Sequence, residues 1–130
     1  MEILIILVIV AALLYYFYNY TFTVKEIEVF SSKIPKGFNG YRILHISDLH
    51  NGCYGERNQK LIHKIKKLSP DVIFFTGDMI DKQSLGKDHF SMLIEGIAHK
   101  YPAYFADGNH EDELSKEEKK EFISLLMMRV

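Results

Sequence analysis

Cysteine and net charge are both scarce in this sequence. The 130 residues include a single cysteine, Cys53, and the formal net charge is −1. One cysteine excludes an internal disulfide and any cysteine-rich zinc site. The balance of 16 basic and 17 acidic residues gives no general attraction to nucleic acid, so no nucleic-acid partner is predicted. Six histidines and 17 carboxylates leave a metal site of the His/Asp type open. The length suits one domain or part of one.

Charged residues are also missing from Ile3 to Val24, where the chain is almost entirely apolar or aromatic. A segment of this length can cross a hydrocarbon core, which needs about 20 residues. The aromatic residues near its end suit a membrane interface. A cleaved signal peptide would normally begin with basic residues and end in a small-residue cleavage site, and neither is present. We therefore expect residues 1–24 to form a single transmembrane anchor, with the lipid bilayer as partner and the orientation open.

The rest of the chain alternates between short apolar runs and amphipathic runs. Loose alternation over residues 21–30, followed by a Pro- and Gly-containing stretch, predicts a strand and linker over residues 25–40. Further strands are predicted at 41–47, 71–76 and 103–106, and helices at 56–68, 88–100 and from Ser115, where Glu118 completes a capping box. Such alternation predicts an α/β domain with a mainly parallel βαβ sheet over residues 41–130.

Each of the three core strands ends in side chains that can bind a metal ion. Asp48 and His50 follow the first strand, Asp78 follows the second, and Asn109 and His110 follow the third. Because the carboxyl ends of parallel strands share one edge of the sheet, these side chains are expected to lie close together. Carboxylate, carboxamide and imidazole ligands suit manganese, iron or zinc. The sequence therefore predicts a divalent metal site at this edge.

Three segments resemble the motifs of one family, the calcineurin-like metallophosphoesterases. The segments Ser47-Asp48-Leu49-His50, Gly77-Asp78-Met79-Ile80-Asp81 and Gly108-Asn109-His110-Glu111 are similar to its D-x-H, G-D-x-x-D and G-N-H-E/D motifs, in the same order. The apolar N-terminus resembles that of the bacterial membrane-anchored branch. The resemblance implies hydrolysis of a phosphomonoester or phosphodiester by a binuclear centre of manganese, iron or zinc. A membrane location makes a lipid-linked phosphoester a candidate substrate.

The resemblance also implies a role for each motif residue. Asp48 and His50 would bind the first metal, Asp78 would bridge both metals, and Asn109 would bind the second. His110 would stand beside the leaving group, and Asp81 would orient that histidine and keep it protonated. Two flanking acids, Asp107 and Glu111, are interpreted as supporting or solvated residues. His45, inside the first strand, is interpreted as a packed and hydrogen-bonded core histidine.

One feature of the family is missing. No histidine follows His110, whereas the family completes its site with three more, including a G-H-x-H block. The four ligands present cannot close two metal sites. The sequence therefore looks like the N-terminal half of a phosphoesterase sandwich, with residues 41–130 as a partial domain. Two other hypotheses stay open: a non-catalytic, membrane-tethered half-domain that binds a metal weakly, and a chain that does not fold stably alone.

Overall fold

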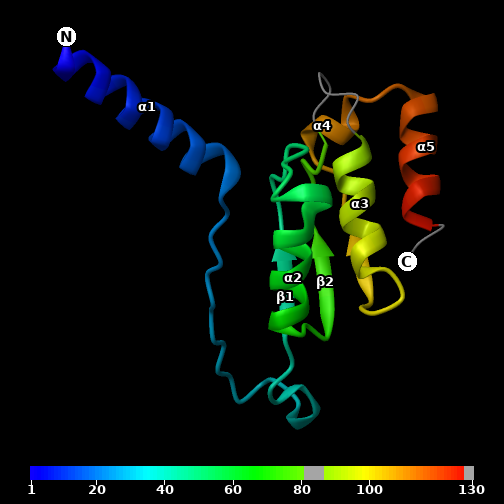
Figure 1. Ribbon diagram of the computed structural model, residues 1–130. Helices are drawn as coiled ribbons and strands as arrows, with labels where there is room; N and C mark the ends of the chain where they lie inside the picture. Colours follow the sequence, from blue (N-terminus) through cyan, green and yellow to red (C-terminus); the bar gives the residue numbers. More distant parts are fainter. Residues whose placement is uncertain (81–86, 128–130) are drawn as a thin grey trace.

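A parallel sheet forms the centre of the computed structural model, which describes residues 1–80 and 87–127 (Figure 1). Its three strands are β1 (Ile43–Ile46), β2 (Val72–Phe75) and β3 (Ala103–Phe105), in the order β1-β2-β3. Both neighbouring pairs are parallel. Each strand lies inside a run that was predicted from its β-branched and aromatic residues. The predicted parallel sheet is therefore confirmed.

Helices connect and cover these strands. Helix α2 (Gln59–Leu68) joins β1 to β2, α3 (Lys87–Ile97) joins β2 to β3, and α5 (Lys116–Met127) follows later in the chain. Figure 1 shows α2 and α3 lying over the sheet, with α5 beyond α3. The strand register places Ile46 and Phe75 in one row, and Phe75 also pairs with Phe105. This row belongs to the hydrophobic core or packs against it.

Aromatic rings join the sheet to two of the helices. Phe90 on α3 is 0% exposed, and its ring lies 5.4 Å from that of Phe75 on β2 in an edge-to-face contact. Phe122 on α5 stacks on Phe90 with ring centroids 5.6 Å apart. Burial of each such side chain contributes about 1.5–3 kcal/mol to stability. The apolar faces predicted for the second and third helices thus form the core.

The opposite face of the sheet is open among the described residues. His45, Phe74 and Tyr104 lie in one row across the three strands, and all three are exposed. Phe74 and Tyr104 stack on each other at 5.5 Å, and His45 Nε2 lies 2.6 Å from Thr76 Oγ1. His45 is hydrogen-bonded as expected, but the prediction that it is buried in the core is wrong. Alternation along β1 turns its side chain to the uncovered face.

The start of the first predicted helix, at residue 56, is irregular. A 3-10 turn, η2 (Glu56–Asn58), precedes α2, and Arg57 and Asn58 have φ values of 51° and 60°. The buried Asn58 side chain sets this kink, because its Oδ1 accepts from the Tyr54 N–H at 2.8 Å and its Nδ2 donates to the His89 carbonyl at 2.7 Å. The predicted capping box of α5 is confirmed: Ser115 N donates to Glu118 Oε2 at 2.9 Å, and Glu118 N donates to Ser115 Oγ at 3.3 Å.

The N-terminal region departs furthest from prediction. Helix α1 (Glu2–Tyr20) ends where Thr21 becomes extended, four residues before the predicted end of the anchor at Val24. In the part of the chain that the structure describes, no helix has both the length and the apolar character that crossing a membrane requires. The transmembrane helix predicted over residues 1–24 is therefore not supported.

The strand predicted in the linker is also absent. Residues 21–30 run without regular structure, and the next element is a short 3-10 turn, η1 (Lys36–Phe38). The prediction was wrong because alternation alone does not make a strand: the backbone also needs a neighbouring strand to pair with. The loop predicted around Pro35 and Gly37 is observed.

Candidate metal centre

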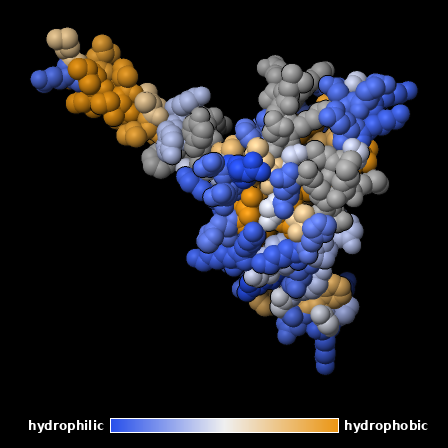
Figure 2. Space-filling view, turned by 45° about the vertical axis from the view of Figure 1, so that its right-hand side comes forward, coloured by the Kyte–Doolittle hydropathy of each residue, from blue (hydrophilic) through white to orange (hydrophobic). Residues whose placement is uncertain are grey.

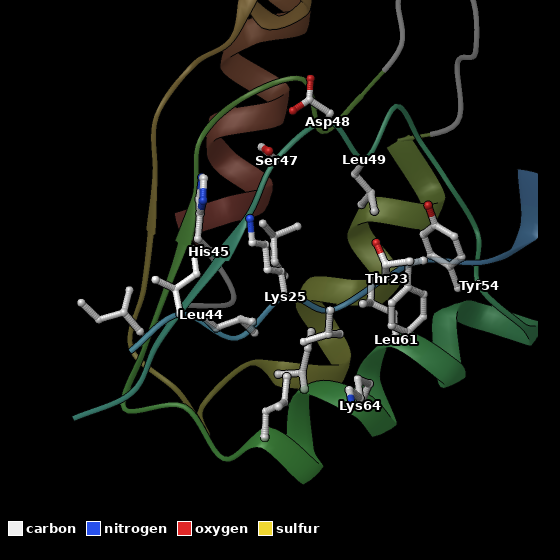
Figure 3. A pocket seen from close by; sticks show the side chains of 17 residues that line it. Thr23, Lys25, Leu44, His45, Ser47, Asp48, Leu49, Tyr54, Leu61 and Lys64 are labelled. Atoms are coloured by element: carbon white, nitrogen blue, oxygen red, sulfur yellow. The ribbon is translucent and has the colours of Figure 1, made fainter. Parts of the chain in front are cut away.

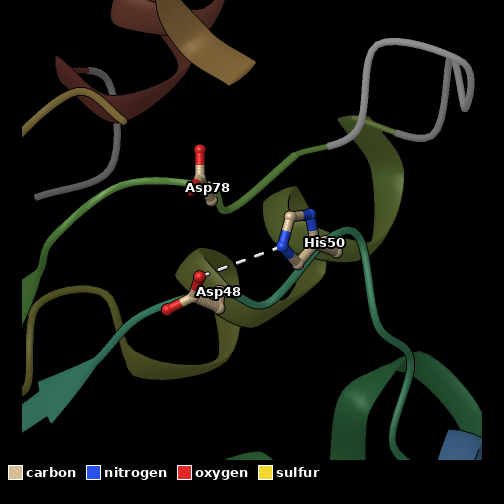
Figure 4. Close-up of side chains that lie close together, drawn as sticks. All are labelled: Asp48, His50 and Asp78. Carbon is tan, nitrogen blue, oxygen red and sulfur yellow. Dashed lines mark ion pairs between the residues drawn. The ribbon is translucent and has the colours of Figure 1, made fainter. Parts of the chain in front are cut away.

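Three of the predicted ligands meet at the carboxyl edge of the sheet. Asp48 and His50 follow β1, Asp78 follows β2, and one ligand atom from each lies within 4.8 Å of the others (Figure 4). His50 Nε2 is 3.9 Å from Asp48 Oδ1. Asp48 and His50 are exposed, whereas Asp78 is half-buried. The group is therefore open to solvent on one side and supported by protein on the other.

The loops that carry these residues are paired through their backbones. Asp48 N donates to the Gly77 carbonyl at 3.2 Å, and His50 N donates to the Asp78 carbonyl at 2.9 Å. The chain turns sharply at these positions, because Asp48, His50 and Asp78 have φ values of 54°, 44° and 56°. Aspartate, asparagine and histidine tolerate this left-handed region better than most residues, yet it is still unfavourable. The three residues that supply the clustered ligand atoms are thus all at left-handed bends.

Two glycines bring the second and third loops into contact. Gly77 has a φ of +92°, and a Cβ on it would meet the Gly108 backbone. A Cβ on Gly108 would lie 2.6 Å from Asp78 Oδ1 and 2.8 Å from Gly77 Cα, and closer still to the Asp78 nitrogen. These distances are too short for any side-chain carbon. The approach of the two loops therefore requires glycine at both positions.

The third motif lies beside the group at the start of α4 (Asn109–Asp112). His110 N donates to Asp78 Oδ1 at 3.0 Å, and the His110 ring meets the His50 ring edge-to-face with centroids 5.0 Å apart. His110 Nδ1 is buried and has no hydrogen-bond partner among the described residues. Asn109 is exposed at the first position of α4. Asp81, the residue predicted to orient His110, lies outside the described residues.

Glu111 has a larger part in this structure than its sequence position indicated. Its side chain is 0% exposed. Oε2 accepts hydrogen bonds from the N–H groups of Asp78 and Gly108, and Oε1 accepts from those of Met79 and Ile80. Of the two alternatives for this residue, supporting or solvated, burial excludes the second. The spacing was a usable signal, because a glutamate three residues after a helix N-cap often bonds back to the cap N–H.

Asp107, the other flanking acid, connects the third loop to α5. Lys119 Nζ lies 2.6 Å from Asp107 Oδ2 and 3.0 Å from Asp112 Oδ1. The hydrogen bond with Asp107, and next that with Asp112, raises the pKa of Lys119 above its ordinary value of 10.5. Asp107 therefore has a charged partner and is not simply solvated.

A pocket of about 530 Å³ adjoins the group (Figure 3). Its walls come from residues 22–27, from β1 and the residues after it, and from α2. Most of the lining is apolar, including Phe22, whose ring meets that of Tyr54 at 5.0 Å. Asp48 lies at one end and Lys64 towards the other, with Lys25 between them. The pocket is thus an apolar cavity with two lysines and a carboxylate in its wall.

The three clustered side chains fit a divalent metal ion. Two carboxylates and one imidazole, each offering an atom within 4.8 Å of the others, can reach a common ion between them. This mixture of oxygen and nitrogen donors suits manganese, iron or zinc. The exposed side leaves room for water or substrate as further ligands. Metal-assisted hydrolysis is the chemistry that such an open site performs.

Comparisons with known proteins give matches over the same region. A transmembrane protein with metallophosphoesterase domain from Danio rerio is 30% identical over 90 residues, which are 68% of this chain and 21% of that protein. The uncharacterized metallophosphoesterase YkuE of Bacillus subtilis is 34% identical over 85 residues, 62% of this chain and 30% of YkuE. A protein from Bos taurus with the same description as the first is 27% identical over 90 residues, 68% of this chain and 20% of its own length.

These matches refine the resemblance in two ways. The relatives come from vertebrates and bacteria, so the assignment to a bacterial membrane-anchored branch is not confirmed. The chain spans about a fifth to a third of the curated relatives it matches. No solved structure matches it.

The family model for calcineurin-like phosphoesterases matches residues 41–129, which include the sheet and all three motifs. The chain therefore belongs to the calcineurin-like phosphoesterase family, whose members are metal-dependent hydrolases.

Proposed function

We propose that this chain takes part in the metal-dependent hydrolysis of a phosphomonoester or phosphodiester. The observation that carries the proposal is the cluster of Asp48, His50 and Asp78, whose ligand atoms lie within 4.8 Å of one another inside the region that the family model matches. In this proposal Asp48 and His50 would hold a first manganese, iron or zinc ion, and Asp78 would be shared with a second. The exposed side of the cluster admits the substrate.

A bound metal would lower the pKa of a water ligand and neutralise charge on the phosphoryl oxygens. The protein's own residues hold and orient the reacting groups. Two hydrogen bonds fix Asp78: its backbone N–H donates to Glu111 Oε2, and its side-chain Oδ1 accepts from the His110 N–H. We assign to His110 the donation of a hydrogen bond or a proton at the leaving-group oxygen. The role of orienting this histidine is assigned to Asp81, which lies outside the described residues. The ring contact with His50 keeps His110 beside the metal ligands.

The second metal has fewer ligands in this chain. Asn109 is its proposed ligand, together with the bridging Asp78. Four residues cannot complete two sites, and we infer that further ligands are supplied by protein other than these 130 residues. We propose on this ground that residues 41–130 act as the N-terminal half of a phosphoesterase domain.

Substitution of Asp78 by asparagine tests the site. The variant keeps the shape of the side chain but removes its charge, so manganese affinity measured by calorimetry should fall by at least about 100-fold. Hydrolysis of a chromogenic phosphodiester, measured with a version of the protein that supplies the missing ligands, should be lost. Glu117→Gln makes the same change of charge at an exposed position of α5, and it should leave both the manganese affinity and the rate of hydrolysis unchanged. Wild-type manganese affinity in Asp78→Asn would refute the assigned role.

A second candidate function is non-catalytic metal binding by a membrane-tethered half-domain. It is favoured by the incomplete ligand set and by the uncovered row of His45, Phe74 and Tyr104, which leaves one sheet face without a second layer among the described residues. This reading predicts weak binding of about one manganese ion per chain and no turnover. Tight binding of two ions by the chain alone would exclude it.

We further propose that α1 associates the protein with a lipid bilayer. Apolar side chains are exposed along this helix, which Figure 2 shows in orange, with Ile3 at 76%, Leu7 at 59% and Leu14 at 65%. The names of the relatives from Danio rerio and Bos taurus, which describe transmembrane proteins, agree with a membrane location. Leu7→Arg should weaken flotation of the full chain with phosphatidylcholine vesicles about 100-fold, because arginine within an apolar helix costs about 2.5–3.5 kcal/mol. Phe38→Arg, on the exposed turn η1, is the control, and equal flotation of both variants would contradict the proposal.

The pocket supports a lipid-linked substrate. Its apolar lining could accept an alkyl chain, Lys25 and Lys64 carry positive charge for an anionic group, and Asp48 connects it to the metal ligands. In the complete enzyme, a chromogenic phosphodiester with an octyl chain should then have a lower KM than its methyl counterpart. Equal KM values would argue for a soluble substrate.

A further inference from the structure

We propose that Glu111 is a positioning residue of the metal centre, and that its buried carboxylate fixes the backbone that presents Asp78. The inference rests on the proposed function, because it takes Asp78 to be a metal ligand. Glu111 does not itself join the cluster of ligand atoms. It acts through the peptide groups of the loop after β2.

Four backbone N–H groups converge on this one carboxylate. Oε2 accepts from Asp78 at 2.7 Å and from Gly108 at 2.9 Å. Oε1 accepts from Met79 at 2.8 Å and from Ile80 at 3.3 Å. Three of these donors are consecutive, so the carboxylate fills a concave arrangement of N–H groups of the kind that binds anions. Each of the two carboxylate oxygens thus accepts two of the four N–H donors.

This arrangement stabilises a backbone conformation that is unfavourable by itself. Asp78 has a φ of 56°, in the left-handed region, and that bend turns its carboxylate towards Asp48 and His50. The Asp78 carboxylate then accepts from the His110 N–H at 3.0 Å. Glu111 therefore holds the backbone of Asp78, while Asp78 holds the backbone of His110, the residue beside Glu111 in sequence. The loops at residues 77–80 and 108–111 therefore hold each other in place. Displacement of the Asp78 or the Glu111 carboxylate would disturb both loops.

The glycine contact explains why this pair of loops is compact. Gly77 and Gly108 approach each other closely through their backbones, and the Glu111 side chain, which is 0% exposed, reaches the N–H groups of residues 78–80. Two carboxylates from adjacent motifs thus have different tasks. Asp78 is accessible enough to meet a metal ion, whereas Glu111 is fully enclosed and cannot.

Hydrogen exchange on the wild-type chain gives the first test. The amides of Asp78, Met79, Ile80 and Gly108 should be protected, and saturating manganese should slow their exchange by at least about tenfold. The reason is reciprocity: if Glu111 orders the loop for metal binding, the bound metal must order the same loop. The amide of Ile65, in the middle of α2, should not respond. Manganese binding that leaves all four amides unchanged would overturn the inference and leave the proposed metal site standing.

The second test is Glu111→Gln in the full chain. The glutamine has the same shape, but its NH2 group faces two N–H donors, so the loop loses half of its acceptors. At a temperature where the variant and wild type have the same far-UV circular dichroism, manganese affinity by calorimetry should fall about 10–100-fold. The exposed Glu117→Gln should bind manganese like wild type. A folded Glu111→Gln variant with wild-type affinity would show that Glu111 serves stability alone.

The two tests separate the possible failures. If Glu111→Gln does not fold, the response of the wild-type amides to manganese decides the matter. If the wild-type chain binds no manganese, the proposed function fails and the inference fails with it. Slowed exchange at residues 78–80 together with weaker binding in the folded variant supports both.

Discussion

Replacement of Gly108 by alanine is the sharpest perturbation that the structure offers. The added methyl group would lie 2.6 Å from Asp78 Oδ1 and 2.8 Å from Gly77 Cα. Its neighbours are mostly backbone atoms, which cannot rotate away as a flexible side chain could. The loops at residues 77–80 and 107–111 must therefore separate.

The size of the effect follows from what the separation disturbs. Overpacking in a rigid environment costs about 1–3 kcal/mol. Weakening of the bonds from Gly108 N to Glu111 and from His110 N to Asp78 adds about 1 kcal/mol for each bond lost. Alanine also restricts the unfolded chain, which offsets about 0.4–1 kcal/mol. We expect a net loss of about 2–5 kcal/mol in the free energy of unfolding, together with weaker manganese binding because Asp78 moves.

The assay is urea unfolding of the full chain in nonionic detergent, followed by calorimetric titration with manganese. Gly37→Ala is the matched control, since a Cβ there has no neighbour within 4 Å, and it should change the free energy of unfolding by less than about 0.5 kcal/mol. If Gly108→Ala unfolds at the wild-type urea concentration and binds manganese equally well, the close packing of the two loops is refuted.

Two further predictions concern stability. Phe90→Ala should lower the free energy of unfolding by about 3–5 kcal/mol, because the ring is fully buried against Phe75 and Phe122, whereas Phe30→Ala, at a side chain that is 86% exposed, should have almost no effect in the same urea titration. Lys119→Gln should lower the unfolding midpoint at pH 8. The pKa of Lys119 is raised in the folded state by Asp107 and Asp112, so its stabilisation is complete below the ordinary value of 10.5 and is lost as the pH rises through the folded-state pKa. The midpoints of Lys119→Gln and wild type should therefore converge when measured between pH 8 and 12, and a constant difference would contradict this account.

Local sequence signals were sufficient for the elements that form the sheet. Four-residue runs such as Val72–Phe75 are apolar and β-favouring, and the intervening helices carry apolar residues at helical spacing. Strand–helix alternation then fixed the parallel arrangement and brought the three strand ends to one edge. That arrangement is what brings Asp48, His50 and Asp78 to the same edge of the sheet.

Features that depend on partners distant in sequence could not be predicted in the same way. Alternation places His45 and Leu44 on opposite faces, but it does not say which face the helices cover. The kink before α2 depends on the bond from Asn58 to the His89 carbonyl, 31 residues away. Residues 21–30 have a strand-like pattern but pair with none of the strands in the described part of the chain. The spacing was enough to recognise Glu111 as a supporting residue. It was not enough to predict which four backbone N–H groups donate to its carboxylate.

The left-handed backbone at the three proposed metal ligands implies a conflict between stability and activity. Asp48, His50 and Asp78 occupy a backbone region that glycine would adopt without strain. Selection for stability alone would favour glycine at all three positions, and the site would then have no ligands. The chain instead has carboxylate and imidazole side chains at positions where the backbone conformation is unfavourable. Evolution towards a more stable form of this protein is therefore expected to change its core and surface before it changes these turns.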